Sequence, residues 1–386
     1  MQISGDNAIE ILNAFLKKLI EKEGTDLHIK SDSIIRARIK GEITPLSLEK
    51  LEHRHVETVV EKLMGKNMEQ FKEKFAYDTI YILDAKHRFR VNLYQQLKGL
   101  SIVFRAIPHV IRSFEQLNLP RSLEKVSHLE RGLVLVTGTT GSGKSTTLAS
   151  IIEDINRTRH RHIITIEDPI EYVYDDNLSV IEQRGIGQHA RNFSDALRSA
   201  MREDPDIIIV GEMRDLETAR NVLQAVNTGH LVFTTLHTLD ARETIDRLLA
   251  IFPQEEQERV RMDLAANLEV VISQRMLRDL KGEMIPAVEL MFKSPRTTHL
   301  ISNSRDDELL DAMHQDQNSS GSIPFDISLF HLTLEGKINE ESAYLHATNA
   351  ANLRLMFTTS AEYQKMLNDG SLEDLVTIKS EDDQDN

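Results

Sequence analysis

The apolar positions near the start of the chain repeat with the period of a helix. Leu12 and Leu16 share one face with further apolar residues of segment 8–20, which is predicted to be an amphipathic helix that stops at Gly24. A second amphipathic helix is predicted over roughly residues 47–74. These two segments would supply the helices of an N-terminal module.

Apolar and polar residues alternate instead in segments 35–40 and 77–108. In the first segment, Ile and Ala alternate with Arg and Lys, which predicts a half-buried strand that turns at Gly41. The second segment, "TIYILDAKHRFRVNLYQQLKGLSIVFRAIP" with its flanks, predicts three strands with turns at 84–86 and 98–99. Connections this short join antiparallel neighbours, so the sequence predicts an antiparallel α+β module.

The pattern changes after a linker that contains Pro108 and Pro120. Continuous apolar runs of about five residues now alternate with helical stretches: "GLVLVTG", "HIITIED", "DIIIVGE" and "HLVFTTLHT". Strands that are apolar throughout belong in a parallel sheet covered on both faces, which predicts an α/β fold. Beyond about residue 255 the pattern predicts mainly helices. The end of the chain, from about residue 361, is acidic and predicted to be disordered.

Composition and charge restrict the class of protein. Apolar residues make up 40% and charged residues 28% of the 386 residues, and the formal net charge is −15. Such an acidic surface repels the phosphate backbone, so we expect no direct nucleic-acid binding. The chain has no cysteine for a disulfide or a thiolate zinc site and no apolar run long enough to span a bilayer. Its first residues, "MQISGDNAIEILN", lack the basic start and apolar core of a secretory signal, so we expect no secretion by that route. A cytoplasmic protein is the simplest interpretation.

One short stretch carries the strongest chemical signal. It matches the phosphate-binding pattern G-x-x-x-x-G-K-[ST] without a mismatch and lies between a predicted strand and a predicted helix. Glycines allow backbone N–H groups to converge on phosphates, and the positive end of the following helix faces the same anion. The lysine reaches the β- and γ-phosphates, and the serine hydroxyl can coordinate Mg²⁺. The predicted nucleotide-binding residues are Gly138, Thr139, Thr140, Gly141, Ser142, Gly143, Lys144, Ser145 and Thr146.

Acidic residues follow two of the other predicted strands. Glu212 ends "DIIIVGE", just past a predicted strand, where a P-loop protein keeps the acid that orients Mg²⁺ or water. Gly211 stands before it, at the position where an aspartate is usual. Glu167, Asp168 and Glu171 follow "HIITI", and Pro169 among them turns the chain out of the sheet. Ligands of open α/β sheets bind at these strand ends, so one of these three acids is expected to orient the attacking water.

His237 follows the strand in "TGHLVFTTLHT". Since it lies at the same predicted edge of the sheet as the acids, we expect it to sense the γ-phosphate.

Together, these segments resemble the type IV pilus retraction ATPases (PilT/PilU-like) of the secretion ATPase superfamily. The resemblance rests on four motifs in order: the Walker A loop, the aspartate box "IEDPIEYV", the Walker B segment "DIIIVGEMRDLET" and the histidine box "TGHLVFTTLHT". It extends over residues 10–355 or so. It implies a PAS-like N-terminal domain, a RecA-like P-loop NTPase domain, a homo-hexamer, ATP with Mg²⁺, and a membrane platform protein as partner.

The resemblance also implies roles and boundaries. Glu171 or Glu167 would be the catalytic glutamate, Glu212 the Walker B acid and a metal ligand with Ser145, and His237 the nucleotide sensor. Arg88, Arg90 and Arg105 are candidates to contact phosphates from the N-terminal domain, and nothing in the sequence selects among them. The implied parts are an N-terminal domain (1–107), a linker (108–121), an ATPase domain with a C-terminal helical region (122–360) and an acidic tail (361–386).

The implied function is ATP hydrolysis coupled to pilus retraction and twitching motility, at the cytoplasmic side of the inner membrane. The chain has neither the long N-terminal extension nor the four-cysteine module of the assembly branch, which favours retraction. "SPRTTHLIS" departs from the short element that follows the core in retraction ATPases, and "ANLRLMF" with the acidic tail is similar to accessory PilU-like paralogues. Two alternatives stay open: a nucleic-acid translocase, and a non-motor ATP-binding partner of a paralogous retraction ATPase.

Overall fold

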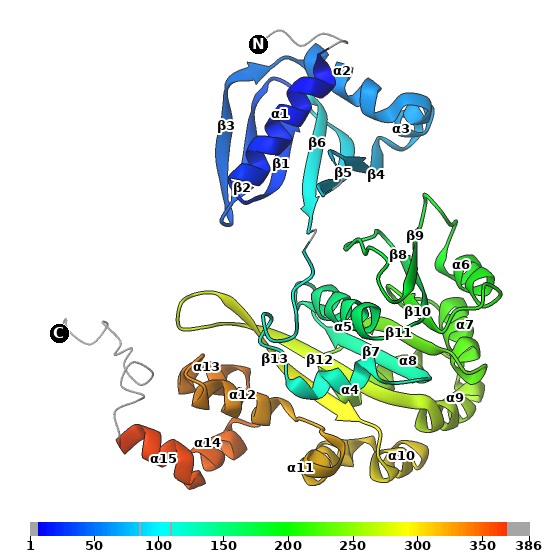
Figure 1. Cartoon of the computed structure of the whole chain (residues 1–386), viewed down its shortest axis with the longest axis vertical. Helices are drawn as coiled ribbons and strands as arrows, with labels where there is room; N and C mark the ends of the chain where they lie inside the picture. The colour runs from blue at the N-terminus through cyan, green and yellow to red at the C-terminus, as the bar shows by residue number, and fades with distance from the viewer. Residues whose placement is uncertain (1–6, 85, 109, 369–386) are drawn as a thin grey trace. The chain divides into compact units, whose positions relative to one another are not determined.

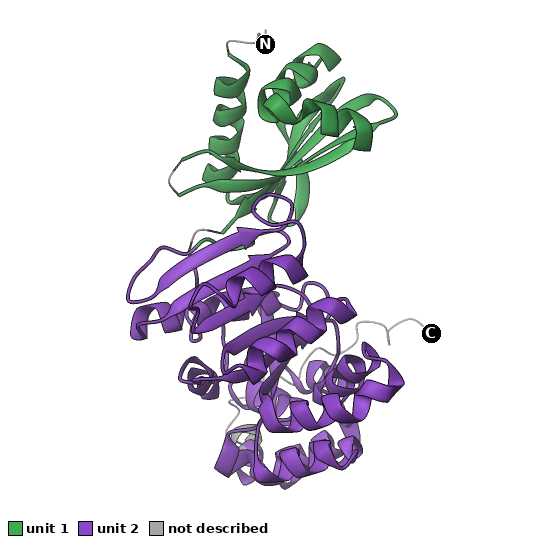
Figure 2. Ribbon diagram, turned by 90° about the vertical axis from the view of Figure 1, so that its right-hand side faces the viewer, with its two compact units in different colours: residues 1–110, 171–173 green, residues 111–170, 174–386 purple. Residues whose placement is uncertain are grey.

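The structure is a computed structural model. It describes residues 7–84, 86–108 and 110–368. These residues form two compact units, one of residues 1–110 with 171–173 and the other of residues 111–170 with 174–386 (Figure 2). The α/β class predicted from the sequence is confirmed.

The first unit is a six-stranded antiparallel sheet with helices on one face (Figure 1). The strand order is β3-β2-β1-β6-β5-β4. Alternate strand residues pack with apolar residues of the helices, and the other face of the sheet carries polar and basic side chains. The elements are α1 (Ala8–Glu21), β1 (Gly24–Lys30), β2 (Ser33–Ile39), β3 (Glu42–Leu51), α2 (His53–Met64), α3 (Met68–Lys74), β4 (Ala76–Ile82), β5 (Arg88–Gln96) and β6 (Gly99–Ile107).

The single long helix predicted over 47–74 is wrong. Residues up to Leu51 extend β3, which pairs with β2 after the turn at Gly41. The helix begins only at His53, and it is interrupted at Gly65, whose φ of +48° ends α2. The pairing with β2 decided the first five residues of this segment, 47–51, and helical periodicity alone could not reveal it.

The second unit is built on a seven-stranded sheet of order β13-β12-β7-β11-β10-β8-β9, parallel except for β13. The elements around it are α4 (Glu124–Ser127), β7 (Gly132–Gly138), α5 (Lys144–Thr158), β8 (His162–Glu167), β9 (Val180–Gly185), α6 (Phe193–Ala200), β10 (Ile207–Val210), α7 (Leu216–Asn227), β11 (Leu231–Leu236), α8 (Ala241–Ala250), α9 (Gln254–Asn267), β12 (Leu268–Arg278) and β13 (Met284–Phe292).

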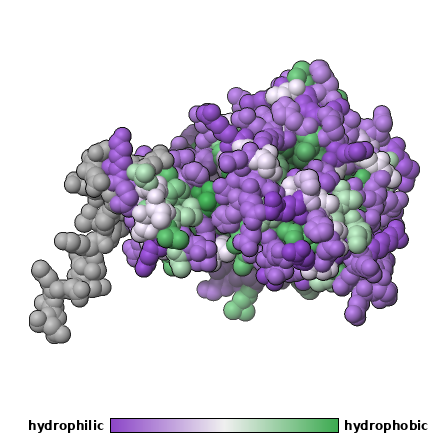
Figure 3. All heavy atoms as spheres, turned by 90° about the horizontal axis from the view of Figure 1, so that it is seen from below, coloured by the Kyte–Doolittle hydropathy of each residue, from purple (hydrophilic) through white to green (hydrophobic). Residues whose placement is uncertain are grey.

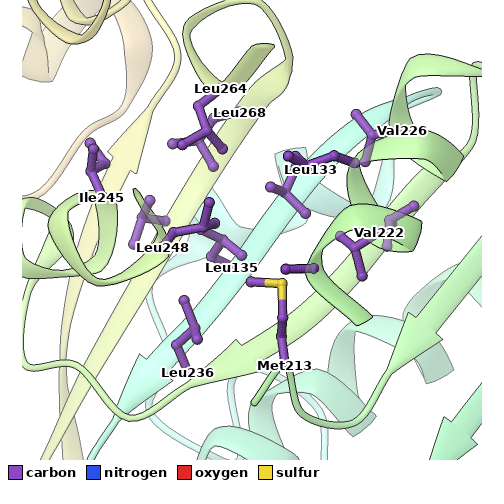
Figure 4. Packing of buried hydrophobic residues seen from close by; sticks show 14 of the residues in the cluster. Leu133, Leu135, Met213, Val222, Val226, Leu236, Ile245, Leu248, Leu264 and Leu268 are labelled. Atoms are coloured by element: carbon purple, nitrogen blue, oxygen red, sulfur yellow. The ribbon is translucent and has the colours of Figure 1, made fainter. Parts of the chain in front are cut away.

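Apolar cores cover both faces of this sheet, as the continuous apolar strands predict. On β7, Leu133 and Leu135 face one core together with α7, α8 and α9 (Figure 4). Val134 and Val136 face the opposite core with apolar residues of α5. Burying a side chain of this kind contributes about 1.5–3 kcal/mol, so the two cores fix the position of the strand that leads into the glycine-rich loop.

The region beyond residue 255 is less helical than predicted. β12 and β13 extend the sheet by two strands, and β12 pairs in parallel with β7. The helices that follow are α10 (Pro295–Ser302), α11 (Leu309–Ser320), α12 (Phe325–Leu334), α13 (Glu340–His346), α14 (Ala350–Thr359) and α15 (Ala361–Asn368). Helices α12 to α15 share an apolar cluster with residues of β12 and β13. We call α12 to α15 the C-terminal bundle.

The first residues of the predicted disordered tail are helical instead. Residues 361–368 form helix α15, and Tyr363 is buried against Phe357 with the two rings 4.7 Å apart. The rest of the predicted tail, residues 369–386, lies outside the described residues.

In the part of the chain that the structure describes, none of the helices combines the length and the apolar character required to cross a bilayer. The face drawn in Figure 3 is mostly hydrophilic, with hydrophobic residues in small separate groups.

Candidate nucleotide-binding and hydrolysis site

The glycine-rich loop leaves β7 and enters α5 through backbone conformations that favour glycine. Gly138, Gly141 and Gly143 have φ angles of +139°, +83° and +88°. A Cβ atom at Gly138 would lie 2.4 Å from the Ser142 hydroxyl and 2.5 Å from the Gln274 carbonyl oxygen. Gly143 occupies the N-cap position of α5 in the left-handed region. The first and last glycines of the pattern are therefore required by geometry.

Lys144 folds back over this loop. Its Nζ atom donates hydrogen bonds to the carbonyl oxygens of Gly138 at 2.8 Å and Thr139 at 3.0 Å. Thr139, Thr140 and Gly141 form the exposed tip of the loop, and Ser145 and Thr146 open the first turn of α5, half-buried. The structure thus brings all nine predicted phosphate-binding residues together in one cradle.

The cradle fits an anion. The Ser142 hydroxyl is buried without a hydrogen-bond partner among the described residues, and the start of α5 directs backbone N–H groups and a positive dipole end toward the loop. Among the described residues, no group of three or more His, Asp or Glu side chains could hold a metal by itself. Mg²⁺ in phosphate-binding sites is generally held by one or two protein ligands together with substrate phosphates.

Glu212 lies just after β10 and has two basic partners. Its carboxylate accepts a hydrogen bond from Nη2 of Arg214 at 2.6 Å, and Nε2 of His237 lies 3.3 Å from its other oxygen. The bond from Arg214 lowers the pKa of Glu212, and the charges of His237 and Lys144 act in the same direction against partial burial. Glu212 is therefore held ionised within the electrostatic reach of the P-loop lysine.

Gly211, which replaces an aspartate at the preceding position, has a structural reason. Its N–H donates to the carbonyl oxygen of Ile166 at 2.7 Å, and its own carbonyl accepts from the Thr235 hydroxyl at 2.6 Å. A Cβ atom here would lie 3.2 Å from that Ile166 oxygen and 3.3 Å from the Cα atom of Glu167. The close approach of β8 and β10 leaves little room for a side chain at this point.

Glu167 ends β8, and its carboxylate is oriented by neighbours. Oε1 accepts from the Thr165 hydroxyl at 2.7 Å, and the Gln183 side-chain amide lies 3.3 Å away. Glu171 is exposed and begins segment 171–173, which is grouped with the first unit. The two candidate glutamates therefore differ in setting: one is fixed at a strand end, and the other lies in a connecting segment.

The candidate arginines lie in the first unit. Arg90 on β5 is directly opposite Arg105 on β6, and Arg105 is in turn opposite Asp26 on β1. Arg105 donates to the buried carboxylate of Asp26 at 2.7 Å, whereas Arg90 is 3.9 Å from the exposed Asp78. Arg88 lies on the same face of β5 as Arg90. These residues form a basic row on the face of the sheet away from the unit's core.

Two residues of the site were not predicted. Arg214 lies two positions after Glu212, and its role could have been suspected from that spacing. Gln274, on β12, is buried beside the loop and donates to the Thr147 hydroxyl of α5 at 2.7 Å. It had no signal in the sequence, because β12 itself was predicted as helix and only its pairing with β7 brings Gln274 to the loop.

The parallel sheet, the glycine-rich loop and the acids at neighbouring strand ends define a P-loop α/β protein. A family model described as "Type II/IV secretion system protein" matches residues 3–309, and the chain belongs to this family. The first expectation from the motifs, membership in the secretion ATPase superfamily, is therefore confirmed.

Within this family, the chain is similar to proteins of type IV pili. The type IV pilus retraction ATPase PilT of Pseudomonas aeruginosa is 42% identical over 324 residues, which cover 83% of this chain and 94% of that protein. The type IV pilus ATPase PilU of the same organism is 34% identical over 352 residues, 90% of this chain and 91% of that protein. A crystal structure of the pilus retraction motor PilT with bound ADP is 38% identical and covers 89% of this chain and 99% of its own, with a TM-score of 0.83.

Proposed function

We propose that this protein is an ATP-hydrolysing motor that powers type IV pilus retraction and thereby twitching motility. The observation that carries the proposal is the meeting of Lys144, Glu212 and His237 at the ends of three neighbouring strands. The similarity to PilT over 83% of the chain supports the same conclusion. The similarity to a PilT structure with bound ADP supports nucleotide binding.

The proposed reaction is the attack of water on the γ-phosphate of ATP, giving ADP and phosphate. The loop amides and Lys144 bind the β- and γ-phosphates and offset the charge that develops during transfer. Ser145 and Glu212 are the residues that would hold Mg²⁺, which neutralises phosphate charge when bound. Glu171 or Glu167 orients the water, and the Thr165 hydroxyl bond to Glu167 supports a positioned carboxylate there. His237 links the γ-phosphate to Glu212.

We further propose that six copies form a ring that works on a platform protein of the inner membrane, from the cytoplasmic side. In this scheme Arg90 or Arg105 of the N-terminal sheet contributes positive charge to the phosphates, as an arginine that stabilises the transition state by about 10³–10⁵ in rate. Hydrolysis and release then alter the position of the N-terminal domain, and this movement is the mechanical output.

The similarity to PilU supports a second form of the same function, an accessory retraction ATPase that works with a paralogous motor. The alignment to PilU includes 352 residues and 90% of this chain, compared with 324 residues and 83% for PilT, although the identity is lower. In that case the purified protein would bind ATP with little turnover and become active in a mixed assembly. The acidic net charge of −15 is unfavourable for a nucleic-acid translocase.

The decisive experiment combines turnover and phenotype. ATP hydrolysis by the purified protein is measured alone, with DNA and with the paralogous motor, for the natural chain and for Lys144→Ala. We expect turnover that DNA does not stimulate and that the substitution abolishes. A deletion strain should carry excess surface pili and lose surface motility. Absent pili would instead indicate a role in assembly, and normal turnover by Lys144→Ala would overturn the site.

A further inference from the structure

Glu289, on β13, is a buried carboxylate that the proposed hydrolysis does not use. Its side chain is 3% exposed, and no Lys, Arg or His among the described residues comes within ion-pairing distance of it. Two other buried carboxylates of this unit have basic partners: Asp306 pairs with Arg261, and Asp316 binds Ser294 and Arg296. Asp326 resembles Glu289 in accepting backbone N–H groups, those of Thr348 and Asn349. Burying a charge without a counter-ion costs free energy. Other groups must therefore stabilise the Glu289 carboxyl group in this position.

The Glu289 carboxyl group binds the first backbone N–H group of one helix and lies near the start of a second. Oε1 accepts from the N–H of Ala241, the first residue of α8, at 2.9 Å. The N–H of Phe325, the first residue of α12, acts more weakly on the same carboxylate and lowers its pKa. The N-cap of α12 is Pro324, which offers no side-chain acceptor, so the carboxyl group of Glu289 is an acidic group near the positive end of this helix. One side chain of β13 thus binds the start of α8 and interacts electrostatically with the start of α12, the first helix of the C-terminal bundle.

Hydrogen bonds connect the first turn of α8 to the loop that carries His237. The Thr238 and Thr244 hydroxyls are 2.6 Å apart, and the N–H of Leu239 donates to the Glu243 carboxylate at 2.7 Å. Only residues 238–240 separate His237 from Ala241. A shift of Ala241 is therefore passed to the histidine whose Nε2 lies 3.3 Å from Glu212.

We infer that Glu289 is a positioning residue that sets His237 against Glu212 and couples the C-terminal bundle to the nucleotide site. Burial raises the pKa of Glu289 to about 7, while Ala241 and Arg275 act in the opposite direction. The carboxyl group is therefore easily held neutral, and its link depends on the hydrogen bond from Ala241 and on the electrostatic interaction with the start of α12. Arg275 of β12 strengthens the same junction, since its guanidinium stacks 3.9 Å from the Phe325 ring and donates to the His346 carbonyl at 2.7 Å.

This inference rests on the proposed ATP hydrolysis, and the steady-state kinetics of Glu289→Ala test it. Removing the acceptor frees the Ala241 N–H and the loop with His237, so we expect kcat to fall about tenfold or more, as small displacements of a catalytic group do. The KM for ATP should change less than about threefold, because the cradle of β7 and α5 is untouched. Glu289→Gln keeps a carbonyl acceptor for Ala241 and should recover most of the lost kcat.

Two controls separate positioning from general loss of stability. Asp316→Ala removes another buried carboxylate of this unit, one whose partners are Ser294 and Arg296, and should leave kcat within about twofold although it lowers the melting temperature. The double variant Glu289→Ala with His237→Ala should be no slower than His237→Ala alone, because both changes disturb the same step. The inference would be overturned if the kcat losses of the two single substitutions multiplied in the double variant. It would also be overturned if Glu289→Ala had the kcat of the natural protein. Absence of ATP hydrolysis by the natural chain in every assembly would instead refute the proposed function.

Discussion

The guanidinium of Arg214 lies 2.6 Å from a carboxylate oxygen of Glu212, although the Arg214 side chain is 71% exposed. Of the influences on the pKa of Glu212, this hydrogen bond is the largest, and it lowers the pKa. Arg214 also faces the charge of Asp168, which raises its own pKa further. An exposed arginine thus keeps the proposed metal-binding acid ionised.

We therefore predict that Arg214→Gln moves the acidic limb of the ATPase pH profile to higher pH. Glu212 must be ionised to bind a cation, and its folded-state pKa rises once the arginine is gone, so activity is lost earlier as pH falls. The measurement is kcat/KM across the acidic range. Arg198→Gln is the matched control, because Arg198 also pairs with carboxylates, those of Asp195 and Glu217, outside the site. Identical acidic limbs in all three proteins would contradict this role.

The two ends of β11 provide a matched pair of histidines. His237, after the strand, contacts Glu212, whereas Nδ1 of His230, before the strand, lies 2.9 Å from the Ala225 carbonyl oxygen. We expect His237→Ala to lower kcat by roughly 10²-fold, the size of the loss when one preorganised hydrogen-bond donor to developing charge is removed, and to leave ATP binding nearly unchanged. His230→Ala should keep kcat. Equal effects of the two substitutions would show that His237 has no special part in hydrolysis.

Arg90 and Arg105 are directly opposite each other but should respond differently to substitution. Arg105 donates a hydrogen bond to the buried carboxylate of Asp26. Burial raises the pKa of Asp26, but the bonds and charges around it, with that of Arg105 first, lower the pKa overall. Arg105→Gln should therefore cost about 1–3 kcal/mol in urea unfolding above the unfolded pKa of Asp26, with a smaller loss as pH falls. Arg90→Gln should leave stability unchanged, because its partner Asp78 is exposed and 3.9 Å away.

The same pair of variants separates a structural arginine from a phosphate-binding one. Arg90→Gln is expected to reduce kcat by 10³-fold or more if Arg90 stabilises the transition state. A kcat loss confined to Arg105→Gln, after correction for the unfolded fraction, would instead assign that role to Arg105.

How much of this site the sequence reveals depends on whether a residue's role is local. The loop from Gly138 to Ser145 is recognisable because glycine spacing, strand and helix all lie within one short segment. Glu212 and His237 could be proposed because parallel strands bring their carboxyl ends to a common edge. In each case a local pattern and one general rule of α/β topology were sufficient.

Glu289 and Gln274 were not accessible in this way. Each acquires its role from partners more than 35 residues away, such as Ala241 for Glu289 and Thr147 for Gln274. β12 lies in a region predicted to be mainly helical until its pairing with β7 is known. In the same way, residues 47–51 of β3 are predicted as helix until their strand's pairing with β2 is known. Side-chain periodicity reports which face of an element is apolar, but strand pairing is a property of the folded chain.

Stability should depend on pH through Glu289. Its pKa of about 7 in the folded protein, compared with 4.5 as the ordinary value, means that folded chains bind a proton that unfolded chains release. Stability is therefore greatest below the unfolded pKa and is lost as pH rises through the folded pKa, by roughly 3 kcal/mol in total. Urea unfolding at pH 5 and pH 8 should show a smaller decrease for Glu289→Gln than for the natural protein. Equal decreases would show that Glu289 ionises normally.

The end of the chain offers a test by truncation. Tyr363 of α15 is 2% exposed, packs on Phe357 and donates a hydrogen bond to Glu340, which also accepts from Tyr344 at 2.7 Å. Truncation after Ser360 should therefore lower the melting temperature, at a cost of about 3 kcal/mol for the lost buried aromatic side chain. Truncation after Asn368 is the matched control and should leave stability unchanged.

Single substitutions at Tyr363 identify which of its contacts matters. Tyr363→Phe keeps the ring packed on Phe357 and removes only the hydroxyl bond to Glu340, so a loss of about 1 kcal/mol is expected. Tyr363→Ala should approach the effect of truncation after Ser360, because most of the stabilisation comes from the buried ring. If both truncations were equally stable, α15 would contribute nothing to the C-terminal bundle, and the boundary of the folded region would lie at residue 360, where the sequence alone had predicted it.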